Sequence, residues 1–303
     1  MTTVPTQSNS PEIEVVPSAD DLGMRLMLAA LGSFELLAIQ LGTELGLYQA
    51  LQDGGPATTA EVAARAGVHE RYAREWLEQQ AVSSFLTVSG DGPERVFTLP
   101  AATAEVLLDT SSLAYSAPMA RIIAGVAVKM PDLVAAYRTG GGVSWEDFGA
   151  VARESQAAMN RPWFEQRLGA ALGGVPEVDE VLRRPGARIA DLGSGGGWSS
   201  IALARAYPQA RVDGYDVDQP SVDMATANAA GAGVSDRVRF HHADVASADI
   251  GEGYDAVFAF ECVHDLPAPV EFLATARAAL RPGGLMIVMD EAVQPEFTAP
   301  GDE

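Results

Sequence analysis

The sequence predicts an α/β protein in which a mostly helical N-terminal half precedes an open parallel sheet. Two observations support this fold class. From Ala187 onward, short apolar runs alternate with helical segments, and a repeated strand and helix is typical of a parallel sheet covered on both faces. Before Ala187, apolar positions recur mostly at helical spacing. With 303 residues, the chain is long enough for two domains.

The N-terminal region has the outline of a winged helix-turn-helix. Residues 1–19 are polar and acidic, which predicts a disordered tail and no export signal. Residues 20–51 are apolar on most sides, as in a helix pair buried in a core or against a second copy of the chain. Polar and charged residues interrupt this stretch, so we expect a buried helix rather than a membrane span. Thr59 is the expected N-cap of the next helix, and a helix over 68–82 then precedes two short extended runs.

The remaining chain divides into a helical connector and a sheet domain. Residues 111–185 have helical spacing that the glycine-rich segment 139–144 interrupts, and residues 183–188 are typical of a linker. The expected strands are the runs ARIADL, RVDGYDV, RVRFHH, YDAVFAF and LMIVMD. We therefore predict a tail over 1–19, a winged-helix-like domain over 20–110, a helical connector over 111–185 and a Rossmann-like domain over 186–303.

The composition excludes several classes of partner. The chain carries 41 acidic and 20 basic residues, a formal charge of −21, which repels phosphate backbones and anionic membranes. We therefore expect neither nucleic acid nor a membrane as a partner. Cys262 is the single cysteine and cannot form an intrachain disulfide, which favours a cytoplasmic location. The cysteine and histidines lack zinc spacing, so no metal is expected.

The stretch ADLGSGGGWS, residues 190–199, is the strongest candidate for a ligand-binding loop. In an open parallel sheet, ligands bind at the carboxyl ends of the strands near the switch point, where this loop would lie. Gly193, Gly195 and Gly197 would let backbone amides approach a ligand closely. Neither possible reading frame gives the third glycine of a dinucleotide fingerprint, and a P-loop lysine is missing. Asp191 would favour a cationic ligand over a pyrophosphate.

At this point the sequence resembles the class I S-adenosylmethionine-dependent methyltransferases. ADLGSGGG resembles their first motif, and four later stretches resemble the motifs of the following strands: VDGYDVDQPSVDMA, HHADV, YDAVFAFECVHDLP and ALRPGGLMIVMDE. The five motifs occur in order across residues 187–291. The N-terminal half is similar to that of the small-molecule O-methyltransferases and of related bacterial two-domain methyltransferases. The resemblance implies that this half forms a homodimer and covers the substrate without binding DNA, as Glu70, Glu75 and Glu78 on the would-be recognition helix also suggest.

The resemblance implies S-adenosyl-L-methionine as the cofactor and a small molecule as the methyl acceptor. Asp216 would accept hydrogen bonds from both ribose hydroxyls. Glu261 would bind the methionine ammonium or a substrate group. His264, followed by Asp265, would be the general base, and packing is the alternative role for this histidine. The remaining expected cofactor residues are Asp191, Gly193, Gly195, Gly197, Val217, Asp244 and Val245, and the expected substrate pocket comprises Trp145, Asn160, Trp163 and Phe164.

Three other side chains have simpler interpretations. His241 and His242 are neighbours on an expected strand and point to opposite faces, so they are not expected to chelate one ion together. Cys262 is expected to be a small core residue rather than a nucleophile. Packing between the domains is the alternative role for the aromatic residues of the expected substrate pocket.

Two alternatives and one departure from the family remain at this stage. A winged-helix transcriptional regulator could use the methyltransferase fold only as a ligand sensor, and a nicotinamide-dependent oxidoreductase is disfavoured by the missing third glycine. Twelve residues follow Glu291, too few for the further strands of this family. We therefore expect a chain truncated after its fifth strand, with that strand as an unprotected edge. The methyl acceptor is expected to be a hydroxyl oxygen.

Overall fold

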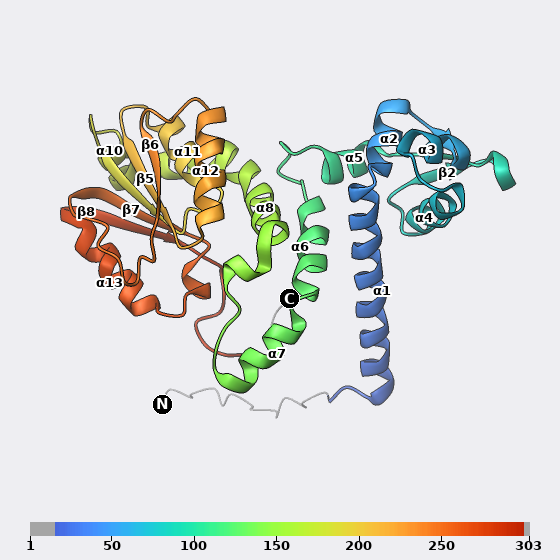
Figure 1. Ribbon diagram of the computed structural model, residues 1–303, viewed down its shortest axis with the longest axis horizontal. Helices are drawn as coiled ribbons and strands as arrows, with labels where there is room; N and C mark the ends of the chain where they lie inside the picture. Colours follow the sequence, from blue (N-terminus) through green and yellow to red (C-terminus); the bar gives the residue numbers. More distant parts are fainter. Residues whose placement is uncertain (1–15, 300–303) are drawn as a thin grey trace, which may run out of the picture.

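The computed structural model describes residues 16–299, in which a small winged domain and a sheet domain lie at opposite ends of the molecule (Figure 1). Helices α6 (Ala117–Ala127) and α8 (Trp145–Trp163) stand between the sheet domain and the long helix α1 (Ala19–Glu44). Most of the tail predicted for residues 1–19 lies outside the described residues. Ser18 caps α1 and Ala19 is already helical.

The N-terminal domain confirms the predicted winged helix. Its three short antiparallel strands lie in the order β1-β3-β2, beside two helices that pack together. The N-cap of helix α3 is Thr58, one residue before the predicted Thr59, and Thr58 shares a capping box with Glu61. The elements are α1, α2 (Leu47–Gly54), β1 (Ala57–Thr58), α3 (Thr59–Ala66), α4 (Glu70–Val82), β2 (Thr87–Ser89), the 3₁₀ turn η1 (Gly92–Glu94), β3 (Val96–Thr98) and α5 (Ala101–Leu108).

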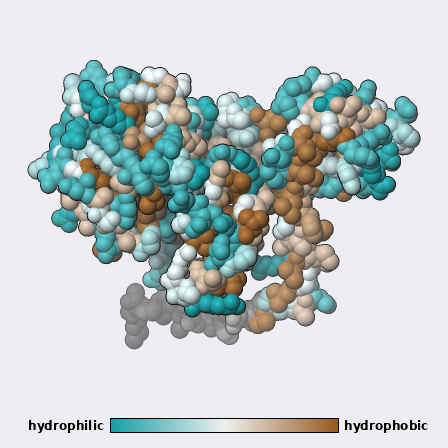
Figure 2. Space-filling model, in the orientation of Figure 1, coloured by the Kyte–Doolittle hydropathy of each residue, from teal (hydrophilic) through white to brown (hydrophobic). Residues whose placement is uncertain are grey.

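Helix α1 is largely exposed within its own chain, so of the two surroundings predicted for it only burial against a second copy remains, and this stays a prediction. Within this chain only Ile39 and Gly42 of the helix are buried. Gly42 lies against the ring of Trp76, whose Nε1–H donates to the carbonyl of Ala38 at 2.8 Å, and this contact fixes α4 on α1. Apolar side chains otherwise run exposed along α1 (Figure 2). By length and composition alone the helix could cross a membrane, a property that core helices of soluble proteins and signal sequences share.

The connector is helical, as predicted, and its longest helix is bent at two places. Gly149 interrupts α8 with φ 72° and ψ −165°, and Pro162 precedes a π-helical turn at its end. The segment 140–144 has no regular structure and leads into α8. The elements are α6, α7 (Met130–Thr139), α8, the π-helical turn η2 (Phe164–Leu168), α9 (Gly169–Gly173) and α10 (Pro176–Leu182).

The sheet domain contains the five predicted strands, all parallel, in the order β6-β5-β4-β7-β8. The chain enters at the central strand β4, builds outward to β6 and then crosses to β7, so the switch point lies between β4 and β7. β8 forms an edge of the sheet. The elements are β4 (Arg188–Leu192), α11 (Trp198–Ala206), β5 (Arg211–Asp216), α12 (Gln219–Gly231), β6 (Val238–His242), β7 (Tyr254–Phe260), the 3₁₀ turn η3 (Val263–Asp265), α13 (Pro269–Ala279) and β8 (Leu280–Met289).

A separate apolar core lies on each face of the sheet, because alternate strand residues point to opposite sides. Ile189 and Phe258 face the core that includes α10, α11 and α12. Ala190 and Val257 face the core that includes Phe272 of α13. Burial on both faces accounts for the nearly continuous apolar sequence of β7, in which every residue is buried. The two cores hold the carboxyl ends of β4, β5 and β7 in one place.

Candidate functional site

The glycine loop after β4 combines one open glycine with tightly packed neighbours. Gly195 has φ 48°, and a Cβ added there would meet nothing within 4 Å. Gly193 has φ 73° and lies against Cys262, where an added Cβ would approach Sγ to 2.9 Å. Gly197 has φ 78° and lies against Phe240, where the same distance would be 2.6 Å. Gly195 therefore leaves room above the loop, and Gly193 and Gly197 let the loop pack against the sheet domain.

Asp191 lies beneath the loop rather than in the wall of the cavity described below. One carboxylate oxygen accepts from the hydroxyls of Ser199 and Ser200, each at 2.6 Å, and the other is buried without a partner. Burial raises the pKa of this carboxyl to about 6, and the two hydroxyl hydrogen bonds oppose the shift. The carboxylate therefore joins the end of β4 to the start of α11. Direct contact of Asp191 with a ligand stays a prediction.

Asp216 presents a firmly oriented carboxylate at the end of β5. Its two oxygens accept from the backbone N–H groups of Gly195 and Asp218, at 2.8 and 2.9 Å. Burial raises the pKa of Asp216, while these two amides favour its ionised form. Each carboxylate oxygen can still accept another hydrogen bond. The side chain can thus meet two neighbouring donors on a ligand.

Asp244 and Val245 lie after β6, on the same side of the sheet as Asp216. The Asp244 carboxylate accepts from the Ala246 amide and the Ser247 hydroxyl, both at 3.0 Å. Val245 is buried, whereas Val217, after β5, is exposed. All three of the predicted residues Val217, Asp244 and Val245 line the cavity.

The segment after β7 is strained and acidic. Glu261 has φ 51°, a conformation that costs a non-glycine residue about 1–3 kcal/mol, and its amide donates to the Met289 carbonyl at 2.8 Å. Burial raises the pKa of Glu261, and the charges of Asp290 and Glu291 add to the shift. This strained backbone turns the Glu261 side chain toward the cavity that it lines.

His264 is held between two carboxylates in the turn η3. Its Nδ1 hydrogen-bonds to Asp290 at the end of β8, and its Nε2 lies 3.3 Å from an oxygen of Asp265. The Asp290 hydrogen bond raises the pKa of His264, an effect that the charge of Asp265 reinforces. Donation from Nδ1 leaves Nε2 of the neutral ring as the proton acceptor. The imidazole is thus oriented by the two carboxylates that flank it.

Helix α8 forms the roof of the site. Ala157 touches the glycine loop so closely that a Cβ at Gly196 would lie 2.7 Å from its methyl group. Trp145 and Asn160 line the cavity, together with Phe164 from the following turn. The neighbouring Trp163 does not line the cavity, because its partly exposed ring packs edge-on against Phe164. Contact of Trp163 with a substrate stays a prediction.

These groups enclose one cavity of about 710 Å³ at the switch point of the sheet. Its floor is the loop with Gly193 and Gly195, its sides carry the ends of β5, β6 and β7, and its roof is α8. Most of the site residues expected from the sequence line this cavity. The lining includes Trp145, Asn160, Phe164, Gly193, Gly195, Asp216, Val217, Asp244, Val245, Glu261 and His264, whereas Asp191, Trp163 and Gly197 lie outside it.

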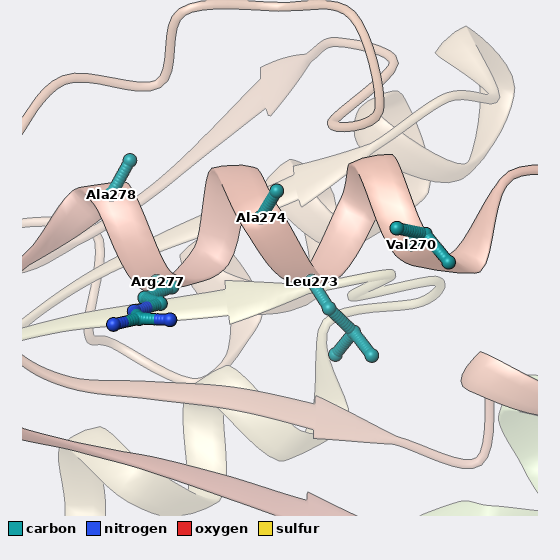
Figure 3. A pocket seen from close by; sticks show the side chains of 5 residues that line it. All are labelled: Val270, Leu273, Ala274, Arg277 and Ala278. Atoms are coloured by element: carbon teal, nitrogen blue, oxygen red, sulfur yellow. The ribbon is translucent and has the colours of Figure 1, made fainter.

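A shallow, open depression lies along the outer side of α13 (Figure 3). One helix supplies all five lining residues, and Leu273 and Arg277 point to the same side (Figure 3). Its lining contains no group that suggests a reaction.

Three side chains important to the geometry were missed from the sequence. Arg153 on α8 forms a buried ion pair with Asp218, and Asp290 orients His264. Asp218 had a local signal, because an acidic residue two positions after a strand and before a helix is a common N-cap. Arg153 and Asp290 had none, since each meets its partner across a long stretch of chain.

Other expected residues have ordinary surroundings. His241 contacts Asp213 at 3.1 Å, and His242 contacts the Val217 carbonyl at 2.9 Å, so the two rings serve different partners. Within residues 16–299, no cluster of three or more acidic, histidine or cysteine residues has metal-binding geometry. Burial raises the pKa of Cys262 to about 12, which keeps its sulfur a thiol.

The comparisons with known proteins match both halves of this arrangement. A methyltransferase domain family matches residues 189–284, the stretch that contains the glycine loop, Asp216 and His264. Residues 189–284 form a methyltransferase domain. An Rv2258c-like winged helix-turn-helix family matches residues 33–109, ahead of the methyltransferase domain.

Relatives and solved structures share this domain order or part of it. A ubiquinone biosynthesis O-methyltransferase from Sinorhizobium fredii is 38% identical over 126 residues, which are 42% of this chain and 49% of that protein. The chain thus spans about half the length of this curated relative. A mitomycin 7-O-methyltransferase structure has a TM-score of 0.69 at 23% identity, over 93% of this chain and 84% of the other. Human N-acetylserotonin methyltransferase, solved with S-adenosylmethionine, has a TM-score of 0.62 at 22% identity, over 90% and 81%.

Proposed function

We propose that the protein is an S-adenosylmethionine-dependent methyltransferase that acts on a hydroxyl oxygen of a small molecule. The observation that carries this proposal is the cavity, which brings the open Gly195, the Asp216 carboxylate and an oriented imidazole together at the switch point of a methyltransferase domain. O-methyltransferases among its relatives and structural neighbours support the reaction class.

The cavity residues fit the three parts of the cofactor. Asp216 offers one free acceptor position on each oxygen, which matches the two hydroxyls of a ribose. Asp244 and Val245 would hold the adenine ring. The space above Gly195 would take the amino-acid end, with Glu261 facing its ammonium group. In this arrangement, Asp191 and Gly197 would act by shaping the loop.

The cofactor would supply a methyl group on a sulfonium, which leaves readily when a nucleophile attacks in line. The chain aligns the acceptor hydroxyl and removes its proton. His264 Nε2 would take that proton as the new oxygen–carbon bond forms and the sulfur–carbon bond breaks. Asp290 holds the ring in the required tautomer, and α8 covers the site.

The charge of the cavity selects among acceptors. Its lining carries the carboxylates of Asp216, Asp244, Glu261, Asp265 and Glu291. Arg153 is the one arginine or lysine among the described lining residues, and its charge is already paired with that of Asp218. Phosphorylated or carboxylated acceptors would meet net repulsion. Trp145 and Phe164 instead favour a neutral or cationic molecule with an aromatic ring, held against the roof.

Calorimetric titration of the purified chain with S-adenosylhomocysteine, NAD and duplex DNA tests the proposed function. We expect saturable binding of S-adenosylhomocysteine at one site per chain and no heat of binding from NAD. DNA should not bind at physiological salt, because the chain carries a formal charge of −21 and the arginines Arg71 and Arg74 on the exposed face of α4 are paired with Glu75 and Glu70. Binding of DNA without S-adenosylhomocysteine would instead favour a transcriptional regulator, and binding of NAD alone would favour an oxidoreductase.

We further propose that residues 20–110 form the dimerisation domain of a cytoplasmic homodimer, residues 111–185 cover the substrate and residues 186–303 bind the cofactor. The exposed side chains of Leu26, Leu31 and Phe34 on α1 form an apolar face that a second copy would bury (Figure 2). The adjacent α6 adds Met119 and Ile123 to the exposed apolar surface.

Sedimentation equilibrium without detergent tests the dimer. The wild-type chain should have twice the mass of one chain, and Leu31→Glu with Phe34→Glu should dissociate it, because two buried charges would lack partners. Tyr72→Glu is the matched control, since Tyr72 is 74% exposed on another helix. A monomeric wild type, or a chain that cosediments with lipid vesicles, would contradict the proposed interface.

A further inference from the structure

Helix α8 is tied to the cofactor side of the cavity by one buried ion pair. The Arg153 guanidinium meets Asp218 as a fork, with Nε–H donating to Oδ2 at 2.5 Å and Nη2–H to Oδ1 at 3.2 Å. The two side chains are only 10% and 1% exposed. The pair joins the roof of the cavity to the turn after β5.

Asp218 belongs to the same turn that positions Asp216. Its amide donates to Asp216, and its Oδ2 caps α12 by accepting from the Ser221 amide at 3.0 Å and hydroxyl at 2.6 Å. Although burial opposes ionisation, the Arg153 fork and these Ser221 hydrogen bonds hold the pKa of Asp218 below its usual value. Arg153 therefore stabilises the charge of the residue that fixes the Asp216 carboxylate.

Arg153 lies close to the kink in α8, so its ion pair holds that part of the helix on the sheet domain. The kink at Gly149 separates Trp145 from the rest of the helix, and Arg153 lies one turn beyond that kink. The far end of α8 is held separately, where the Arg161 guanidinium lies 3.9 Å from the centre of the Trp198 ring. Arg153 is thus the charged contact that holds the kinked end of the roof on the sheet domain.

We propose that Arg153 is a positioning residue that couples closure of the roof helix to ribose binding at Asp216. The inference rests on the proposed function. With Arg153 seated on Asp218, the roof holds Trp145 over the acceptor space while the turn holds Asp216 toward the ribose. Ligand binding at Asp216 and ordering of α8 then favour each other, and the coupling is reciprocal.

Hydrogen exchange of α8, measured with and without S-adenosylhomocysteine, tests the coupling. In the wild type, this ligand should slow exchange of the amides over residues 150–160. Arg153→Met keeps the apolar stem and removes the fork, so we expect the protection to disappear and the dissociation constant of S-adenosylhomocysteine to rise by about 5- to 150-fold. Arg153→Lys retains the charge without the fork and should give an intermediate value.

Arg121→Met is the matched control, because Arg121 pairs with Glu154 at 2.8 Å on the side of α8 that faces α6. It should retain both the affinity and the ligand-dependent protection. A folded Arg153→Met chain that keeps both would overturn the coupling, and if that variant does not fold, the same result with Arg153→Lys would do so. Failure of the wild type to bind S-adenosylhomocysteine would instead contradict the proposed function itself.

Discussion

Asp216→Asn is expected to weaken binding of S-adenosylhomocysteine by about 10- to 100-fold, a loss of about 1.5–3 kcal/mol for a hydrogen bond to a charged acceptor. The variant keeps the shape of the side chain, but it exchanges one acceptor oxygen for a donor and removes the charge. In either orientation that donor would face a backbone amide that now donates to Asp216, either that of Gly195 at 2.8 Å or that of Asp218 at 2.9 Å, and one ribose hydroxyl would lose its acceptor. Calorimetric titration measures the change.

Asp213→Asn is the control for Asp216→Asn. Asp213 lies on the same strand but bonds to His241 and Tyr254, away from the cavity. It should bind S-adenosylhomocysteine as the wild type does. Equal affinities for wild type and a folded Asp216→Asn chain would show that Asp216 does not hold the ribose.

His264→Ala is expected to lower the rate of methyl transfer to a hydroxyl acceptor by a factor of about 10²–10⁴, the usual contribution of a general base. Binding of S-adenosylhomocysteine should stay within twofold, because His264 would contact the acceptor rather than the cofactor. Transfer of a labelled methyl group to an acceptor used by the wild type provides the measurement. His69→Ala, in the winged domain, should leave the rate unchanged.

The pH dependence follows from the sign of the His264 shift. Since the Asp290 hydrogen bond raises the pKa of His264, the neutral ring predominates only above that raised value. The wild-type rate should therefore rise with pH through the pKa. Asp290→Asn removes the charge that holds the proton, so its rising limb should move to lower pH. An Asp290→Asn profile that coincides with that of the wild type would contradict the assigned role of Asp290.

The sequence predicted the sheet domain well because its information is local. Each buried strand forms an uninterrupted apolar run, as in β7, and each motif residue follows its own strand directly. Parallel strands place their carboxyl ends together, so Asp216, Asp244, Glu261 and His264 could be assigned to one cavity before any contact was known. The glycines were also found, although only their packing distinguishes Gly195 from Gly197.

The parts that the sequence did not predict depend on distant contacts. The Arg153–Asp218 pair joins residues 65 positions apart, and the sequence around each residue does not indicate which residue it pairs with. Whether α1 is covered by its own chain or by a second copy could not be decided from the sequence, because an apolar helix has the same pattern in both cases. Trp163 and Phe164 are adjacent aromatic residues, yet of the two only Phe164 lines the cavity.

The most direct test of the central claim is a crystal structure of the chain with S-adenosylhomocysteine. The account predicts electron density in the 710 Å³ cavity, with the two ribose hydroxyls on the two oxygens of Asp216 and the sulfur facing His264. Density at another place, or a ribose turned away from Asp216, would contradict the assignment of this cavity as the methyltransferase site.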